Sequence, residues 1–240
     1  MIRNEQNRYG KQLSEKHYRF RILGQGPTLL ILGGPSDDWE SILELLSSQF
    51  TLLIPSFSRS ILEKQPGTPD PIYYVDSLLS ELSVDRYSIL AHSLSAWLGL
   101  RLAAVHPERV TKLILANLPS NIEDKSSFDQ LHRLLAGAKK PRLSDNSSFW
   151  FDQICSEAND FNDVKSVLRE MPFLMITGET DRFFSREKFV NWSKIEEDFN
   201  LEVIRFSGHF TMKDNPWYFS AIVKEFLQSH SYKPLKTWMA

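Results

Sequence analysis

Short apolar runs alternate with segments of helical spacing along most of the chain, and this alternation constrains the fold more than any other feature. Strands that alternate with helices predict βαβ units and a parallel sheet. The expected strands are residues 17–23, 28–32, 51–54, 87–91, 110–115, 173–177 and 201–206. The expected helices are residues 39–48, 71–82, 94–105, 186–197 and 216–227. We therefore expect an α/β fold with a mostly parallel, doubly wound sheet.

The composition is that of an ordinary folded domain. Hydrophobic residues make up 42% of the 240-residue chain and charged residues 24%, which is close to the average for globular proteins. A chain of this length can bury one sizeable core without being divided. We expect a single domain over residues 1–240.

The charge balance bears on the partners of the protein. Lysine and arginine number 28 against 30 aspartate and glutamate, for a formal net charge of -2. Binding to a phosphate backbone needs a basic excess. We therefore expect no nucleic-acid partner.

Cysteine usage and apolar segments bear on the compartment. The single cysteine, Cys155, cannot form an internal disulfide, which fits a reducing cytoplasm and also a disulfide-free exported protein. Residues 1–16 are polar where a secretory signal would be apolar. No stretch reaches the roughly 18 apolar residues of a membrane helix. We expect a cytoplasmic protein without a membrane span.

The alternation is interrupted between residues 119 and 170, where strand signals disappear and polar, helix-prone pieces follow. We interpret this segment as an inserted lid. It contains an aromatic cluster, from which Phe149 and Trp150 are candidates to wall an apolar substrate pocket together with Phe210. Packing in the core is the alternative role for such a cluster.

The candidate nucleophile is Ser93. It lies in the segment Ala-His-Ser-Leu-Ser at residues 91–95, between a predicted buried strand and a predicted helix. A serine on such a turn is a nucleophile elbow, which exposes its hydroxyl to substrate and base. The usual pattern is G-x-S-x-G, and here Ala91 and Ser95 stand in place of the glycines. Taken alone, this match is equally compatible with a plain strand-to-helix turn.

A serine hydroxyl needs a base, and His209 is the best candidate for it. It follows the predicted strand 201–206 and precedes the last predicted helix, so it lies at the carboxyl edge of the sheet. Ligands bind at that edge in open α/β sheets. The other histidines, His92 among them, have simpler structural interpretations.

The base needs a carboxylate that fixes its tautomer. Asp181 follows the predicted strand 173–177 and is placed at the same edge, with Glu179 as a close rival. Asn117, after the preceding strand, carries no charge. We expect Asp181 to be the acid and Glu179 to be solvated.

An oxyanion intermediate needs two convergent N–H donors. One is expected from the amide of Leu94, directly after the nucleophile, and the other from Gly34 after the strand 28–32. Gly34 lets its backbone approach a substrate, and it keeps the hydrogen that Pro35 lacks. A plain glycine turn is the alternative for residues 33–34.

The order of nucleophile, acid and base, with each at a strand end, resembles the α/β-hydrolase superfamily over residues 18–227. Leu-Gly-Gly-Pro at residues 32–35 is similar to the His-Gly-Gly-Pro motif of proline iminopeptidase-like members, with Leu32 in place of the histidine. The strand 51–54 also lacks the usual Asp-rich turn after it. The segment 178–183 resembles the acid segment of carbon-carbon bond hydrolases.

This resemblance implies an α/β-hydrolase fold with a small helical lid and a Ser-His-Asp mechanism that uses neither metal nor cofactor. The leading hypothesis is hydrolysis of a carboxylic ester or thioester through an acyl-enzyme. Cleavage of a carbon-carbon bond is the second. A ligand-binding protein with little turnover is the third, because both elbow glycines are replaced.

Overall fold

The computed structural model describes residues 19–33, 39–56, 71–93, 95–118, 171–183 and 200–231. Across these ranges, no helix combines the length and the apolar character needed to cross a membrane. The elements are, in chain order, β1 (Arg19–Leu23), β2 (Thr28–Leu32), α1 (Glu40–Ser47), β3 (Thr51–Ser56), α3 (Pro71–Glu81), β4 (Tyr87–His92), α4 (Ser95–Val105), β5 (Val110–Ala116), β6 (Phe173–Gly178), β7 (Leu201–Ile204), α9 (Thr211–Asp214) and α10 (Pro216–Gln228).

The described strands form one sheet in the order β1-β3-β2-β4-β5-β6-β7. Only β1 is antiparallel to its neighbour, β3, and the other pairs are parallel. The chain leaves β2 toward β3 and then crosses to β4 on the other side, so the direction of winding changes there. The carboxyl ends of β2 and β4 therefore flank a topological switch point, where α/β folds bind ligands.

Side chains of β2 explain why its sequence is apolar without alternation. Leu29, Leu30, Ile31 and Leu32 are all fully buried. Successive residues of a strand point to opposite faces. Leu30 and Leu32 join the core on one face, and Leu29 and Ile31 join the core on the other. A strand that is buried on both faces needs such a continuous apolar run.

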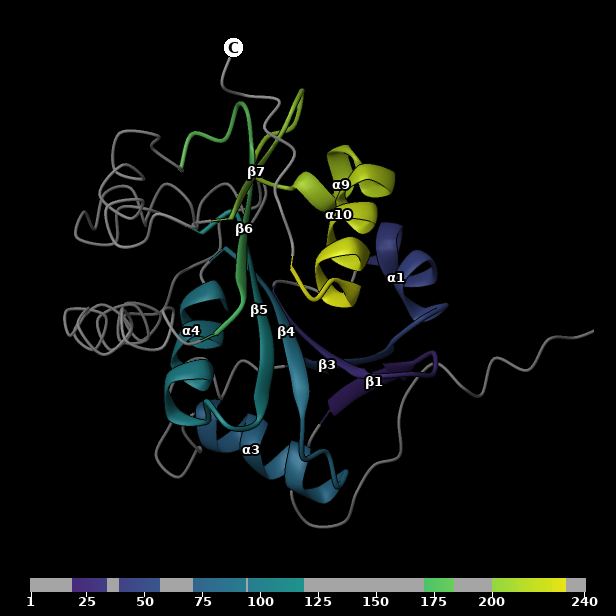
Figure 1. Cartoon of the computed structure of the whole chain (residues 1–240), viewed down its shortest axis with the longest axis vertical. Helices are drawn as coiled ribbons and strands as arrows, with labels where there is room; N and C mark the ends of the chain where they lie inside the picture. The colour runs from purple at the N-terminus through teal and green to yellow at the C-terminus, as the bar shows by residue number, and fades with distance from the viewer. Residues whose placement is uncertain are drawn as a thin grey trace, which may run out of the picture.

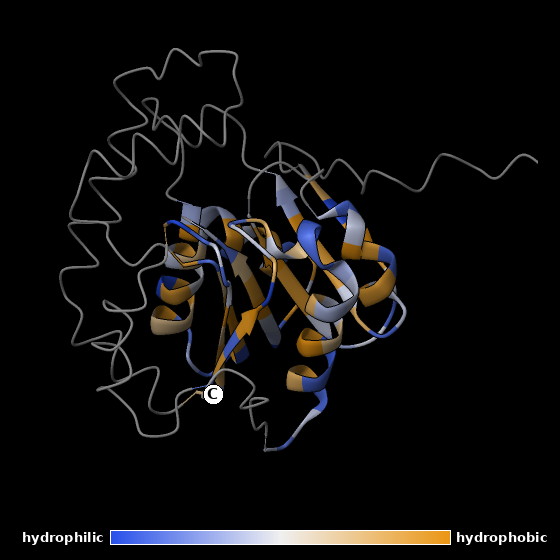
Figure 2. Ribbon diagram, turned by 90° about the horizontal axis from the view of Figure 1, so that it is seen from above, coloured by the Kyte–Doolittle hydropathy of each residue, from blue (hydrophilic) through white to orange (hydrophobic). Residues whose placement is uncertain are grey.

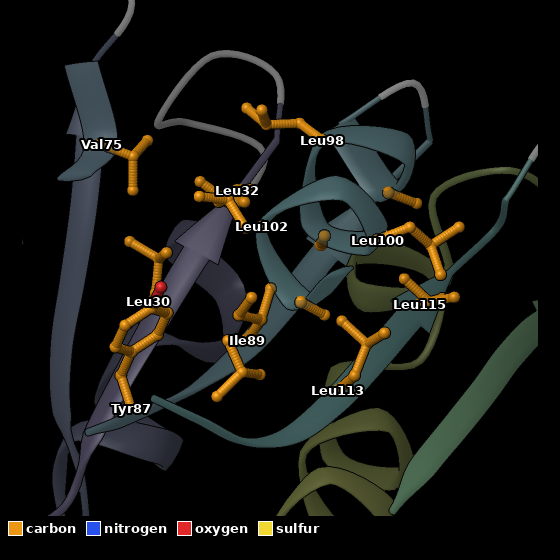
Figure 3. Close-up of a cluster of buried hydrophobic side chains, with 14 of the residues drawn as sticks. Leu30, Leu32, Val75, Tyr87, Ile89, Leu98, Leu100, Leu102, Leu113 and Leu115 are labelled. Carbon is orange, nitrogen blue, oxygen red and sulfur yellow. The ribbon is translucent and has the colours of Figure 1, made fainter. Parts of the chain in front are cut away.

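Helices cover both faces of the sheet (Figure 1). α3 and α4 pack together on one face, and α1, α9 and α10 pack together on the other. Seen from above, much of the central sheet is apolar, and the helices carry both apolar and hydrophilic residues (Figure 2). Figure 3 shows the core under α3 and α4, where Leu102 from α4 lies among side chains of β2, β4 and β5. The two cores hold the strand ends in fixed positions.

The α/β class and the mostly parallel sheet expected from the sequence are confirmed. Two strand ends were wrong by two residues, because the strand expected at residues 51–54 runs to Ser56 and the strand expected at 201–206 ends at Ile204. Phe206 has a left-handed φ of 56° and is 92% exposed, so it belongs to a turn. The short helix α9 was not expected. The predicted lid and the helix 186–197 lie outside the described residues.

Candidate active site

Ser93 occupies a strained turn between β4 and α4. Its φ is 55°, in the left-handed region that non-glycine residues seldom adopt. Its N–H donates to the carbonyl of Ala116 at 2.9 Å, and its own carbonyl accepts from the N–H of Ala96 at 3.0 Å. These two bonds fix the turn against β5 and the start of α4. The side chain is thereby held at the carboxyl edge of the sheet.

The turn that carries His209 brings its ring to Ser93. His209 lies between β7 and α9, and its Nε2 is 2.9 Å from Ser93 Oγ. The N–H of Gly208 donates to Asp214 Oδ2 at 2.7 Å, which closes this turn. The distance from Oγ to Nε2 allows direct transfer of the hydroxyl proton to the imidazole.

Asp181 contacts the other nitrogen of the same ring. His209 Nδ1 is 3.1 Å from Asp181 Oδ2 and 3.2 Å from Oδ1. The Asp181 side chain is fully buried. Burial alone would raise the pKa of Asp181, but the hydrogen bonds from His209, Asn117 and the Phe183 N–H outweigh it and lower that pKa below its ordinary value. The carboxylate is therefore charged at neutral pH and holds the Nδ1–H tautomer.

Gly178 lets the turns that carry Asp181 and His209 approach each other. A side chain at Gly178 would place its Cβ 2.2 Å from the carbonyl oxygen of Gly208 and 2.3 Å from that of Ser207. Both contacts are impossible for a real Cβ, so the sequence needs glycine at this last residue of β6. The strand ends of β6 and β7 are thereby close enough for one carboxylate to reach the ring.

Glu179, the rival acid, points elsewhere. It is exposed, and its Oε2 accepts the backbone N–H of Phe206 at 3.1 Å. This bond stabilises the turn after β7. The structure thus brings Asp181, and not Glu179, to the His209 ring.

Solved structures share this architecture, although no protein-family model matches the chain. An α/β hydrolase from a lagoon-sediment metagenome matches with a TM-score of 0.67 and 17% identity, over 91% of this chain and 98% of that one. The chain has the α/β-hydrolase fold. The meta-cleavage product hydrolase of Pseudomonas fluorescens matches with a TM-score of 0.69 and 17% identity, over 92% of this chain and 98% of that one. A marine microorganism esterase matches with 0.63 and 18%, over 87% and 98%.

Curated relatives match part of this chain. An uncharacterized protein of Mycobacterium tuberculosis is 28% identical over 134 residues, which cover 52% of this chain and 38% of that protein. A human serine hydrolase-like protein is 30% identical over 119 residues, which cover 45% of this chain and 57% of that protein. The matched part therefore spans less than two thirds of each relative.

Two residues near Ser93 were not assigned to the site from sequence. His92 is buried, and its Nε2–H donates to the carbonyl oxygen of His209 at 2.7 Å. Burial, with the nearby His209 ring, lowers the pKa of His92 to about 3. A neutral His92 therefore holds the backbone of His209. Its position next to Ser93 was the only sequence signal for this contact.

Asn117 is the second such residue. It follows β5, is fully buried and has a φ of 51°. Its Nδ2 is 2.8 Å from Asp181 Oδ2 and 3.2 Å from the Gly208 carbonyl, and its Oδ1 accepts from Thr211 Oγ1 at 2.7 Å. It was set aside at the sequence level because it has no charge. Its place after a central strand was the signal that could have found it.

Aromatic rings surround the imidazole. Phe183 lies edge-on to the His209 ring with centroids 5.0 Å apart, and Phe210 lies at 5.5 Å on another side. Phe210 is half-buried and also packs against His92 at 5.4 Å. These contacts restrict rotation of the His209 ring. The assignment of Phe210 to a substrate pocket stays a prediction.

Several expected site residues cannot be placed. The expected oxyanion donors Gly34 and Leu94 lie outside the described residues, as do Phe149 and Trp150 of the expected lid. Their roles stay predictions. Among the residues that the structure does describe, no group of three or more His, Cys, Asp or Glu side chains could hold a metal ion.

Proposed function

We propose that this chain is a serine hydrolase that cleaves a small-molecule carboxylic ester or thioester through an acyl-enzyme. The observation that carries the proposal is the continuous relay from Ser93 Oγ through the His209 ring to Asp181, with donor-acceptor distances of 2.9 Å and 3.1 Å. Nucleophile, base and orienting acid in this geometry are the machinery of acyl transfer.

Acylation uses each member of the relay once. His209 Nε2 accepts the proton from Ser93 Oγ as the oxygen attacks the substrate carbonyl carbon. Asp181 stabilises the imidazolium that forms. The tetrahedral intermediate then collapses, the bond to the leaving oxygen or sulfur breaks, and the imidazolium returns its proton to that atom. The amides of Gly34 and Leu94 are our candidates for binding the oxyanion.

Deacylation repeats the sequence with water. His209 Nε2 removes a proton from water, whose oxygen attacks the acyl carbon bound to Ser93. The second tetrahedral intermediate releases the carboxylic acid, and Ser93 Oγ recovers its proton from His209. The net reaction is ester plus water to acid plus alcohol, or thiol for a thioester.

The comparisons support this class without naming a substrate. An esterase and a serine hydrolase-like protein are among the proteins that this chain resembles. The left-handed φ of Ser93 adds support, since strain of this kind gathers at functional sites and exposes the nucleophile of an elbow.

The decisive experiment combines labelling with turnover. Purified protein is treated with a fluorophosphonate probe and assayed on p-nitrophenyl esters of graded chain length beside acyl-thioesters. We expect one label on Ser93 and measurable hydrolysis of at least one series. A folded protein that takes no label at Ser93 and hydrolyses none of them contradicts the proposal and favours the ligand-binding alternative.

Carbon-carbon bond hydrolysis is the second candidate. The likeness to the meta-cleavage product hydrolase of Pseudomonas fluorescens, with a TM-score of 0.69, supports this second candidate. Such an enzyme would cleave a vinylogous diketone with the same three residues. Turnover of a vinylogous diketone, in a protein labelled at Ser93 but inactive on all esters and thioesters, would select this candidate.

A further inference from the structure

Asn117 connects the candidate acid to the turn of the candidate base through a single amide group. The Asp181 carboxylate and the Gly208 carbonyl can only accept hydrogen bonds. The Asn117 atom that lies 2.8 Å from one and 3.2 Å from the other must therefore be the NH₂ nitrogen. One of its hydrogens is donated to the Asp181 carboxylate, and the other is donated to the Gly208 carbonyl, directly before His209.

The side-chain oxygen and the backbone N–H of Asn117 are also engaged. Its Oδ1 accepts the hydroxyl of Thr211 at 2.7 Å, and Thr211 is the fully buried first residue of α9. Its backbone N–H donates to the carbonyl of Ile176 in β6 at 2.7 Å. The side-chain amide therefore cannot rotate without breaking its contacts to Asp181, to the Gly208 carbonyl and to Thr211 at once. A buried and fully satisfied polar network of this kind is rigid.

The backbone of Asn117 is strained, and its side chain explains why the strain is kept. A φ of 51° costs an L-residue about 1–2 kcal/mol, and glycine would avoid that cost. Asparagine tolerates this region better than most residues. Only a side chain with two donors and an acceptor could serve Asp181, Gly208 and Thr211 together, and glycine offers none.

We infer that Asn117 is a positioning residue, which holds the Asp181 carboxylate and the turn of His209 in one fixed relation. The inference rests on the proposed function, because it assigns Asp181 as acid and His209 as base. Asn117 does not touch the nucleophile in this network. Its effect passes through the angle and distance at which the carboxylate meets the His209 ring.

Two substitutions separate the amide from the backbone. Asn117→Gly keeps the left-handed φ available and removes every side-chain contact, whereas Asn117→Asp keeps the shape and replaces the NH₂ donor with an acceptor oxygen. In each variant we expect kcat on an activated p-nitrophenyl ester to fall about 10- to 100-fold, as for partners that orient catalytic groups. KM should change by less than about threefold, because neither substitution targets a residue that we assign to substrate binding.

The pH profile adds a readout that a merely structural role would not move. Without the Asn117 donor, Asp181 retains more negative charge density toward the imidazole and holds a proton there more firmly. The acidic limb of the kcat profile of Asn117→Gly should therefore move to higher pH.

Asn200→Gly is the matched control. The Nδ2 of Asn200 donates to the Phe173 carbonyl at 3.3 Å, beside the amino end of β6 and away from the carboxyl edge. This variant should lose stability without a change in kcat or in the pH profile.

Fluorophosphonate labelling of the wild type separates the two proposals, since an unlabelled and inactive wild type overturns the proposed function itself. An active, labelled wild type with unchanged kcat and pH profile in both folded Asn117 variants overturns the positioning role alone.

Discussion

Ala91 and Gly99 pack directly against each other where α4 crosses β4. A Cβ at Gly99 would lie 3.0 Å from the Cβ of Ala91 and 3.3 Å from Ile89 Cγ2. Ala91 stands where the usual elbow has glycine, and Gly99 supplies the missing space from the helix. Alanine at position 91 is thus accommodated by a residue six positions after Ser93.

We predict that the effect of Gly99→Ala on stability depends on residue 91. In the wild type the added methyl is overpacked, so the free energy of unfolding should fall by about 1 kcal/mol despite a better helix propensity. In an Ala91→Gly background the shortest contact is gone, and the same substitution should be neutral or stabilising. Urea unfolding of the four proteins measures the coupling. Equal effects in both backgrounds would show that the two residues do not compensate each other.

Ser93 allows a test that separates strain from chemistry. Ser93→Ala and Ser93→Gly both remove the hydroxyl, so we expect both to abolish hydrolysis. At a φ of 55°, alanine retains the backbone strain and glycine does not. The free energy of unfolding of the glycine variant should therefore be about 1 kcal/mol higher than that of the alanine variant. Thermal or urea unfolding of the pair checks this difference, and an alanine variant that is at least as stable would contradict the strained elbow.

The acid can be assigned by turnover of two variants. Asp181→Asn removes the charge that fixes the Nδ1–H tautomer of His209, so kcat should fall by on the order of 10⁴. Glu179→Gln keeps an oxygen that can accept the Phe206 N–H and should change the rate little. A severe loss in Glu179→Gln with a mild one in Asp181→Asn would mean that the acid is assigned wrongly.

Periodicity predicted the sheet well because burial on both faces leaves a strong local signal. The run 28–32 is apolar throughout, and β2 has those same bounds. The proximity of Ser93, Asp181 and His209 could also be predicted from the sequence. Each of the three follows a strand, and parallel strands end at one edge of the sheet. The end of β7 could not be predicted, because Phe206 is an apolar residue in a turn and is exposed. Composition alone gave no reason to end the strand before it.

The supporting residues were harder to predict for a physical reason. Asn117 and His92 act through hydrogen bonds to backbone carbonyls of the base turn, and a single sequence carries no pattern for such contacts. Their neighbours in space come from 91 and 117 positions away along the chain. Only the fold brings them together, so polarity at a buried strand end was the sole available clue.

His92 should make the stability of the protein depend on pH in a defined window. The unfolded chain binds a proton at His92 near its ordinary pKa of 6.5, whereas the folded protein does so only near 3. The unfolded state therefore binds more protons between these values, and stability is lost as the pH falls through this window. The stabilisation is fully present above 6.5, and its loss levels off near 3.

The corresponding variant is His92→Gln, which removes the titrating ring and offers an N–H close to the position of Nε2. Since one pKa unit corresponds to about 1.4 kcal/mol, His92 alone should cost the wild type about 2–3 kcal/mol between pH 6 and pH 4. Asp181 has a lowered pKa and acts with the same sign at lower pH, in both proteins. Urea unfolding at several pH values should therefore give a smaller loss in His92→Gln than in the wild type. Equal losses would show that His92 takes up its proton in the folded protein as readily as in the unfolded chain.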